Sequence, residues 1–469
     1  MRILILGGGQ VGSTVAKNLV TQADNAVTVI DIDEAALKNL GESLDIQTLV
    51  GNAASPTVLA AAGAEDTDLL LALTRSDETN LVACSLAKHV FNIPARIARV
   101  RHGDIVEYGL PETADDEESE HSVLSLFSVS ESICPEQLIT EQLFGLFQYA
   151  TALQVLNFAH GTVQMVVTRA QTGGLLVGRL LGEIHDDLPD EVDCQIFAIY
   201  RNDSLILPTS QTKLIHGDEV FFLAPQEHVP LILKELHPES KPAKKIMIAG
   251  GGNIGFRLAR QAESLFDIKI IERNPKRADW LSENLSSALV LSGSGTDENL
   301  LSHEHVEEID VFCALTNDDE DNIMSGLLAK NFGANRVISI VNRSSYVDLL
   351  QGNTIDIVVS PHLTTIGSIL AHIRRGDIVA VHPLRRGEAE IIEAVVHGDR
   401  KTSKIIGRPF SQIKWPHGCQ VAAVVRDDVF FGGHHEIELQ EGDHVIFFVS
   451  RRQVVHELEK MLQVKLGFF

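Results

Sequence analysis

The chain has 469 residues, of which 44% are hydrophobic and 22% are charged, and its formal net charge is −25. This length corresponds to about three typical domains, and the composition is that of a globular protein and not of a disordered one. Nucleic-acid phosphates and an anionic membrane leaflet would both repel so acidic a surface, so a role at a membrane would require docking on another protein.

The sequence carries no pattern of export or membrane insertion. It begins MRILILGGG, whose glycines interrupt the apolar run too early for a signal peptide. No stretch approaches the roughly 18 to 20 apolar residues of a spanning helix. The cysteines have no CxxC spacing, which argues against a disulfide scaffold or a structural zinc site. We therefore expect a soluble protein of a reducing compartment, the cytoplasm.

In chain order, the first unit alternates apolar runs with amphipathic stretches. Five apolar runs are typical of buried parallel strands: ILIL, AVTVID, IQTLV, DLLLAL and ARIARV. Residues 11–20 and 78–91, which lie between them, have the pattern of helices. This alternation predicts an α/β fold with a Rossmann-like, doubly wound parallel sheet over residues 1–125.

A smaller α+β domain is expected at residues 145–235, where shorter β runs occur, for example at 192–200 and 219–223. The polar segment HPESKPAK at 237–244 predicts a linker. The same two kinds of unit then return at 244–370 and 376–463. The acidic run DDEESE at 115–120 has two interpretations, a cation site or a solvated loop, and the loop is favoured because like charges repel.

An internal repeat supports this order of units. RILILGGGQVG near the start matches KIMIAGGGNIG in the middle of the chain, and LTRSDETN at 73–80 matches LTNDDEDN at 315–322. HGDEVFFL at 216–223 matches EGDHVIFF at 441–448. Ordered matches over most of the chain indicate two tandem Rossmann-like domains, each followed by a small α+β domain.

A glycine-rich turn follows the first strand of each Rossmann-like unit. In GxGxxG, the first glycine permits the tight turn, the second lets the backbone approach a pyrophosphate, and the third lets the helix pack closely. The helix that follows offers free N–H groups to the phosphates. The predicted cofactor-binding residues are Gly7, Gly8, Gly9, Gln10, Val11 and Gly12 in the first turn, and Gly250, Gly251, Gly252, Asn253, Ile254 and Gly255 in the second.

An acidic residue ends the second strand of each unit, about 20 residues after the glycines. These residues are Asp31 and Glu272. A carboxylate in this place accepts hydrogen bonds from ribose hydroxyls and repels a 2′-phosphate, which favours NAD over NADP. The alternative interpretation is an ordinary glycine turn with a surface acid.

Further candidates follow the fourth strand of each unit, because the carboxyl ends of these strands border the same crevice. They are Thr74 and Arg75 in the first unit and Thr316 and Asn317 in the second. We expect these four residues to complete the two cofactor sites.

Arg99 and Arg101 end the fifth strand of the first unit. A guanidinium there can pair with phosphate oxygens, or alternatively form a surface salt bridge. Their rough counterparts in the second unit are Ser339 and Val341, so the first site should bind a charged polyphosphate more tightly. We expect no metal site: the adjacent His434 and His435 would point to opposite faces of a strand.

The following segments together carry a resemblance to a known family: ILGGGQVG, VIDID, LTRSDETNLVAC, NIPARIARVR, GGGNIG, IERN and LTNDDEDNIMS. The chain resembles the RCK/KTN family, the regulators of potassium conductance. The resemblance covers nearly the whole chain. It implies a non-catalytic regulatory subunit that gates an integral-membrane potassium channel or transporter subunit, as a homotetramer on the cytoplasmic side of the inner membrane. It also implies NAD(H) as the ligand of the residues named above, with ADP and ATP as alternatives.

The chain departs from the family pattern after the third strand of each unit. The family commonly has Gly-Asp-Ala there, whereas this chain has Gly51-Asn52-Ala53 and Gly293-Ser294-Gly295, so both carboxylates are missing. The alternative function is an NAD-dependent oxidoreductase. It is disfavoured because the smaller domains offer no evident His–Asp or Lys catalytic pair. A DNA-binding regulator is disfavoured because no basic reading helix is present.

Overall fold

The computed structural model describes residues 1–20, 25–107, 122–183, 188–189, 192–238, 240–343, 346–347, 350, 355–373, 377–384, 388–433, 437–451 and 454–463. The acidic run at 115–120 and the pair His434-His435 lie outside these residues. Two compact units are formed, one by Met1–Leu138 with Pro361–Ile373 and the other by Ile139–Ser360 with Arg374–Phe469. Within the described ranges, no helix combines the length and the apolar character that a bilayer crossing requires.

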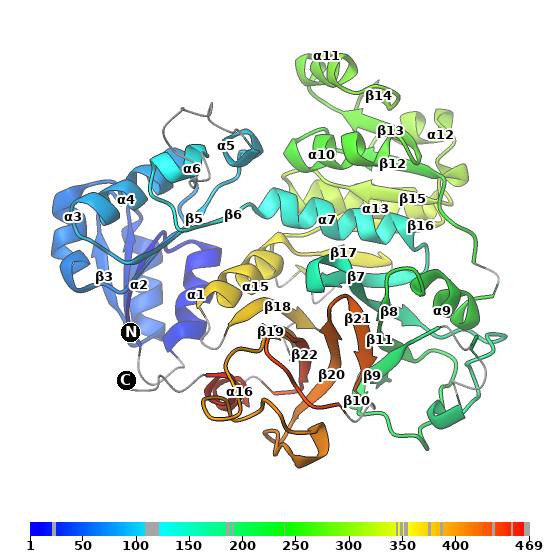
Figure 1. Ribbon diagram of the computed structural model, residues 1–469. Coiled ribbons are helices and arrows are strands. Elements are labelled where there is room, and N and C mark those ends of the chain that lie inside the picture. The colour runs from blue at the N-terminus through cyan, green and yellow to red at the C-terminus, as the bar shows by residue number, and fades with distance from the viewer. Residues whose placement is uncertain are drawn as a thin grey trace, which may run out of the picture. The chain divides into compact units, whose positions relative to one another are not determined.

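The first unit is built on a six-stranded parallel sheet, drawn in blue to cyan in Figure 1. Its strand order is β3-β2-β1-β4-β5-β6. This order is that of a dinucleotide-binding sheet, so the predicted doubly wound fold is confirmed. The sixth strand was not predicted and lies beyond residue 125. The strands are β1 (Arg2–Leu6), β2 (Ala26–Asp31), β3 (Gln47–Val50), β4 (Leu69–Ala72), β5 (Ala95–Arg99) and β6 (Glu131–Ile133).

Alternate residues of β1 face two separate apolar layers, because successive side chains of a strand point to opposite faces. Ile3 and Ile5 pack in one cluster with α1, while Leu4 and Leu6 pack in another with α3 and α4. Cys84 of α4 is fully buried in the second layer, and burial raises the pKa of its thiol to about 12, so it is an inert core residue. The helices are α1 (Gln10–Val20), α2 (Glu34–Ser43), α3 (Pro56–Ala61), η1 (Ala64–Asp66), α4 (Asp77–His89), α5 (Gly103–Glu107) and α6 (Val123–Leu126).

The second unit contains a matching parallel sheet in the order β14-β13-β12-β15-β16-β17. This match confirms the predicted duplication. Its strands are β12 (Lys245–Ala249), β13 (Asp267–Glu272), β14 (Leu289–Ser292), β15 (Val311–Ala314), β16 (Arg336–Ile340) and β17 (Ile357–Val359). Its helices are α10 (Asn253–Ala262), α11 (Pro275–Asn284), α12 (Glu298–His303), η4 (Val306–Glu308) and α13 (Asp319–Asn331).

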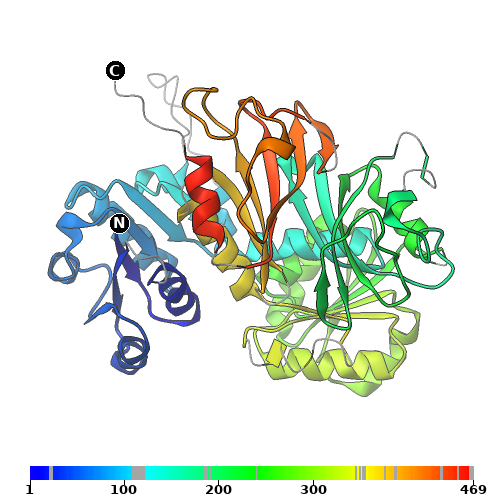
Figure 2. The ribbon, with the colours of Figure 1, turned by 90° about the horizontal axis from the view of Figure 1, so that it is seen from below.

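Two five-stranded antiparallel sheets in the second unit correspond to the predicted α+β domains. Their orders are β10-β9-β11-β8-β7 and β18-β19-β22-β20-β21. The sheets share one apolar core that includes Phe197, Phe221 and Phe448, so they pack together (Figure 2). Their elements are β7 (Ala152–Phe158), η2 (Ala159–Gly161), β8 (Val163–Arg169), η3 (Leu181–Glu183), β9 (Gln195–Arg201), β10 (Ser204–Ile206), β11 (Glu219–Pro225) and α9 (Val229–Leu236), and β18 (Ile378–Leu384), β19 (Ala389–Val395), η6 (Phe410–Gln412), β20 (Cys419–Arg426), β21 (Val429–Gly432), β22 (His444–Val449) and α16 (Val455–Leu462).

The repeated Gly-Asp motif of these domains is explained by a buried ion pair. Asp218 accepts two hydrogen bonds of 2.8 Å from the guanidinium of Arg201, and Asp443 accepts equivalent bonds of 2.7 and 2.8 Å from Arg426. Both aspartates are almost fully buried, so the bidentate geometry offsets their desolvation. The motif therefore fixes the turn before the last strand of each small domain.

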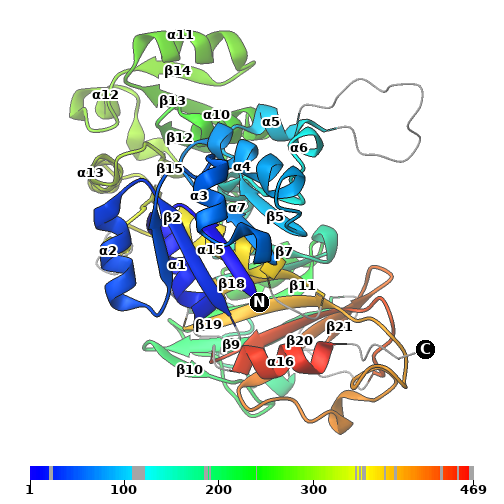
Figure 3. The same cartoon turned by 90° about the vertical axis from the view of Figure 1, so that its left-hand side faces the viewer.

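The helix that follows each Rossmann-like sheet does not cover that sheet. Helix α15 (Pro361–Ile373) follows the second sheet in sequence but packs against α1 of the first (Figures 1 and 3). Helix α7 (Pro135–Gln148) follows the first sheet, and its residues Ile139 and Leu143 pack with Ile246 of the second. Arg336 of β16 donates to the carbonyl oxygens of Leu146, Tyr149 and Ala152, which secures the end of α7. The sequence patterns did not predict this exchange.

Candidate functional site

The first glycine turn has the geometry that its spacing predicts. Gly7 has φ 104°, a left-handed conformation that favours glycine, and its N–H donates to the carbonyl oxygen of Ile30 at 2.8 Å. A Cβ on Gly12 would lie 1.9 Å from the carbonyl oxygen of Gly7. Gly250 (φ 114°) and Gly255 repeat both features, with the same 1.9 Å approach. These four glycines are therefore required by the fold itself.

Gly9 and Gly252 are different, because a Cβ on either residue would meet no atom within 4 Å. Both glycines are exposed and stand directly before the helices α1 and α10. Gly252 caps α10 without a side-chain hydrogen bond. The backbone here is open to an approaching group at a helix N-terminus, which is the place and the polarity that a phosphate needs.

The two predicted acids are anchored to the glycine turns. The carboxylate of Asp31 accepts from the backbone N–H of Gly8 at 2.5 Å and from that of Asp33 at 2.9 Å. Glu272 accepts from Gly251 at 2.9 Å and from Asn274 at 2.7 Å. Each acid is thus held at the edge of its turn, in the place where a ribose would lie.

A buried asparagine that sequence reasoning missed joins the ends of two strands in each unit. Asn80 accepts from the N–H and the hydroxyl of Thr74 at 3.0 and 2.7 Å, and donates to the carbonyl oxygen of Arg99 at 2.8 Å. Asn322 accepts from Thr316 at 2.8 and 2.7 Å and donates to Ile340 at 3.0 Å. Both amides are fully buried. The sequence does contain a sign of this role, because an asparagine ends both of the matching segments LTRSDETN and LTNDDEDN.

The predicted arginines have different environments. Burial and the neighbouring charge of Arg101 lower the pKa of Arg99, and the Nε of Arg99 is buried with no hydrogen-bond partner among the described residues. The Nε of Arg101 instead donates to Glu136 at 2.9 Å. Arg75 lies close enough to affect Arg99 electrostatically. Of the two arginines at the end of β5, Arg99 therefore has a buried guanidinium nitrogen that is left available to a ligand.

The residues of the second unit that we expected to correspond to Arg99 and Arg101 were wrong by one position. Asn80 and Asn322 bond to the carbonyls of Arg99 and Ile340, so Ile340 is the equivalent of Arg99 and not Ser339. By the same register Asn342 and not Val341 is the equivalent of Arg101. The second unit is shorter by one residue between α13 and β16, and the motifs alone could not locate this deletion.

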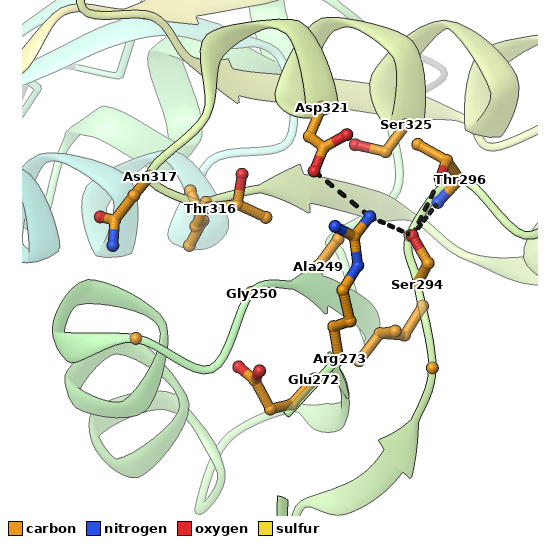
Figure 4. A pocket seen from close by; sticks show the side chains of 15 residues that line it. Ala249, Gly250, Glu272, Arg273, Ser294, Thr296, Thr316, Asn317, Asp321 and Ser325 are labelled. Atoms are coloured by element: carbon orange, nitrogen blue, oxygen red, sulfur yellow. Dashed lines mark hydrogen bonds and ion pairs between the residues drawn. The ribbon is translucent and has the colours of Figure 1, made fainter. Parts of the chain in front are cut away.

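The second unit has a cavity of about 240 Å³ at the carboxyl edge of its sheet (Figure 4). Of the residues predicted for the second site, the cavity is lined by Gly250, Gly252, Glu272, Thr316 and Asn317. The predicted Gly251, Asn253, Ile254 and Gly255 are not among its lining residues. Residues that the prediction missed complete the wall: Ala249, Ile271, Arg273, Gly293, Ser294, Gly295, Thr296, Leu315, Asp321 and Ser325.

Among the residues that the structure describes, no group of three His, Cys, Asp or Glu side chains could hold a metal ion. The closely spaced His303 and His305 have other partners: His303 bonds to the carbonyl oxygen of Asn299 at 2.7 Å, and His305 lies 3.1 Å from Glu307.

Comparison with protein families matches both pairs of units. The family profile of the TrkA-N domain matches residues 3–115 and 246–361, and that of the TrkA-C domain matches residues 168–237 and 400–463. The order of the matches is that of the internal repeat.

Relatives of known name match along the whole length. The Trk system potassium uptake protein TrkA of Halomonas elongata is 44% identical over 470 residues, which cover 100% of both chains. The protein of the same name from Vibrio alginolyticus is 42% identical over 463 residues, 99% of each chain.

Among solved structures, the RCK domain of GsuK aligns with a TM-score of 0.61 at 19% identity, covering 98% of this chain and 94% of that one. The GsuK channel bound to NAD aligns with a TM-score of 0.60 at 18% identity, covering 98% of this chain and 78% of that one. These likenesses show the fold, and the sequence matches show the family. The chain belongs to the family of the Trk system potassium uptake protein TrkA.

Proposed function

We propose that the chain is a nucleotide-binding regulatory subunit that gates a Trk-type potassium uptake channel or transporter. One observation supports this proposal above the others. Two glycine turns of the same geometry, each with an anchored acid, an open backbone and a buried asparagine, occur in a chain whose family takes part in potassium uptake. Duplicated sites of this kind suit sensing better than turnover, so the proposed role is a regulatory one.

The proposed ligand is NAD(H), with ADP and ATP as alternatives. The residues fit such a ligand, because the space above Gly9 and Gly252 is open and the Nε of Arg99 has no protein partner among the described residues. A structural relative is described as the GsuK channel bound to NAD, which agrees with this choice. The proposed sites are the residues predicted above, with Asn80 and Asn322 as positioning residues.

The proposed partner is an integral-membrane subunit of the TrkH or TrkG type, with this chain as a homotetramer on the cytoplasmic face of the inner membrane. Bound nucleotide then acts as a ligand and not as a reactant. A ligand shifts a conformational equilibrium only through its different affinities for the two states. A roughly threefold preference at each of about eight sites would sum to about 5 kcal/mol, close to the roughly 5.5 kcal/mol that moves a population from 1:99 to 99:1.

The first experiment is mass spectrometry of nucleotide retained by the native protein, followed by calorimetry with NAD, NADH, ADP and ATP. Gly9→Val and Gly252→Val should each remove one site without disturbing the fold, because their side chains would enter open space. Retention of no nucleotide, with no binding by calorimetry, would contradict the proposal.

The second experiment tests gating by measuring potassium flux through the reconstituted partner. Non-hydrolysable analogues of the bound nucleotide should change the flux as the natural ligand does. A response that required hydrolysis or hydride transfer would overturn the regulatory proposal and support an NAD-dependent oxidoreductase instead.

A further inference from the structure

An arginine crosses the cavity of the second site. The Nη2 atom of Arg273, at the end of β13, lies 3.1 Å from the hydroxyl oxygen of Ser294 and 3.3 Å from the carboxylate of Asp321 on α13 (Figure 4). All three residues line the cavity. One guanidinium thus connects three separate parts of the cavity wall.

The contacts of Arg273 can be exchanged for contacts with a ligand. The side chains of Arg273 and Asp321 are 67% and 39% exposed, and ion pairs with this exposure contribute little stability. Both groups are polar, face the cavity and lie in the same wall as Ser325. A molecule that offers new partners to both groups can therefore separate them at small cost.

The position of the pair indicates which part of a nucleotide it would meet. The glycine turn at Gly250 and Gly252 lies at one part of the wall and is suited to phosphates. Arg273 and Asp321 extend beyond Glu272, which is placed to meet the ribose. The base of a bound nucleotide would then lie between Arg273 and Asp321.

The first unit lacks this pair. In the matching sequences, Ile32 stands in place of Arg273, Asn52 in place of Ser294 and Thr79 in place of Asp321. Ile32 is 78% exposed and carries no charge. The chain therefore contains a natural control, in which the same fold presents a site without the two charged side chains.

Resting on the proposed function, we infer that Arg273 and Asp321 recognise the base at the second site and select adenine. The planar guanidinium of Arg273 stacks on the ring, as arginine does on aromatic faces. The carboxylate of Asp321 accepts a hydrogen bond from the exocyclic amino group of adenine, in the way that acidic side chains accept from the amino groups of bases. A base with an oxygen at this position, such as hypoxanthine or guanine, places lone pairs against the carboxylate and is rejected.

The test compares NAD with nicotinamide hypoxanthine dinucleotide, in which an oxygen replaces this amino group of the base. The two probes have the same charge, so their affinity ratio cancels the general electrostatic contribution. Binding is measured by calorimetry on the full-length Gly9→Val protein, in which only the second site remains. We expect a preference of about fivefold or more for NAD, consistent with one hydrogen bond to a partly exposed charged group.

Asp321→Asn should bring the ratio close to one, because an amide can donate to the oxygen as well as accept from the amino group. Glu320→Gln is the matched control: it removes the same charge from the same turn of α13, but Glu320 bonds to Arg343 and does not line the cavity. Arg273→Ile should weaken both probes by similar factors. Thr79→Asp in the Gly252→Val protein should introduce the NAD preference into the first site.

Three results would overturn the inference. The first is an unchanged affinity ratio between the two probes in Asp321→Asn. The second is a loss of the NAD preference in Glu320→Gln equal to that in Asp321→Asn. The third is that Gly9→Val binds neither probe while Gly252→Val still binds NAD. In the first two cases the second site still binds nucleotide, and in the third case the first site does, so the proposed function would stand. Failure of both single-site proteins and of the unmodified chain to bind any nucleotide would instead contradict the proposed function.

Discussion

The side-chain amide of Asn80 donates a hydrogen bond to the carbonyl oxygen of Arg99 at 2.8 Å, so one buried residue joins the end of β4 to the end of β5. Replacing Asn80 by Ala leaves the N–H of Thr74 and the carbonyl of Arg99 without this partner, at a cost of about 1–3 kcal/mol for each unsatisfied buried group. We expect faster amide exchange in β4 and β5 of Asn80→Ala. Exchange in β15 and β16 should stay unchanged, and Asn322→Ala should show the opposite pattern. Equal protection in both variants would contradict the role of this asparagine.

The glycines of one turn should differ in their tolerance of a methyl group. Gly12→Ala must displace the backbone of Gly7, because the new Cβ would lie 1.9 Å from its carbonyl oxygen. Such overpacking typically costs about 1–3 kcal/mol. Gly9→Ala has open space and should change the stability by less than about 0.5 kcal/mol. Amide exchange of β1 and α1 measures the difference, and a stable Gly12→Ala protein would show that the turn has a different geometry.

Asp31 should contribute to dinucleotide binding in the first site. Asp31→Ala should weaken NAD binding by about 1–3 kcal/mol, the scale of a hydrogen bond to a charged group. Asp33→Asn is the control, since it removes a neighbouring charge but keeps the cap on the N-terminus of α2. Calorimetry on the Gly252→Val protein isolates the first site, and an unchanged affinity in Asp31→Ala would remove this residue from it.

The two sites should differ in their affinity for polyphosphates. Arg99 and Arg75 belong to the proposed first site, whereas Ile340 and Asn317 occupy the equivalent positions of the second unit. ATP should therefore bind more tightly in Gly252→Val than in Gly9→Val. Arg99→Ile should lower ATP affinity in the first site by about tenfold, within the range for charge-assisted hydrogen bonds. Arg2→Ala, which removes an exposed ion pair with Asp66, is the control for charge. Tighter ATP binding in Gly9→Val would reverse the ranking.

His237 should make the first small domain sensitive to acid. Its Nε2 lies 2.7 Å from the hydroxyl of Thr168, which itself donates to Thr151, so the imidazole donates from Nε2. Its Nδ1 is buried with no partner among the described residues, and burial lowers the pKa of His237 below the ordinary 6.5. The folded state therefore binds this proton less readily than the unfolded state, and stability falls as the pH falls below about 6.5.

The measurement is amide exchange in β8 and α9 at pH 7 and pH 5. His237→Gln keeps a side-chain donor but does not titrate, so its protection should depend less on pH. The same loss of protection in both proteins would assign the acid sensitivity to other groups.

Much of the fold could be predicted because its signals are local. The buried parallel strands, the glycine turns and the acids at the ends of β2 and β13 each follow from a few adjacent residues. The duplication followed from matching pieces. The short strand β6 was not predicted, because three residues carry too little pattern. The buried start of the expected linker was also missed: His237 is only 3% exposed, although its neighbours are polar.

The features that escaped prediction depend on distant contacts. An amphipathic helix shows the same apolar stripe whichever sheet it covers, so the packing of Ile366 and Ile369 beside Ile3 could not be read from α15 itself. Similarly, no local pattern places Arg273 near Asp321, because the two residues belong to elements that are far apart in the sequence. The walls of the second site therefore required the structure, whereas its glycine turn did not.

The position of α15 has a consequence for the synthesis of the chain. The first parallel sheet is synthesised before the helix that covers Ile3, Ile5 and Val15, because this helix is formed by residues 361–373. While the intervening residues are being translated, this apolar face has no cover from its native helix, and exposed apolar surface of this kind promotes aggregation. The first Rossmann-like domain can thus be completed only after residues 361–373 have been synthesised. A protein truncated after the first small domain would lack α15 and therefore part of the apolar core of its first sheet.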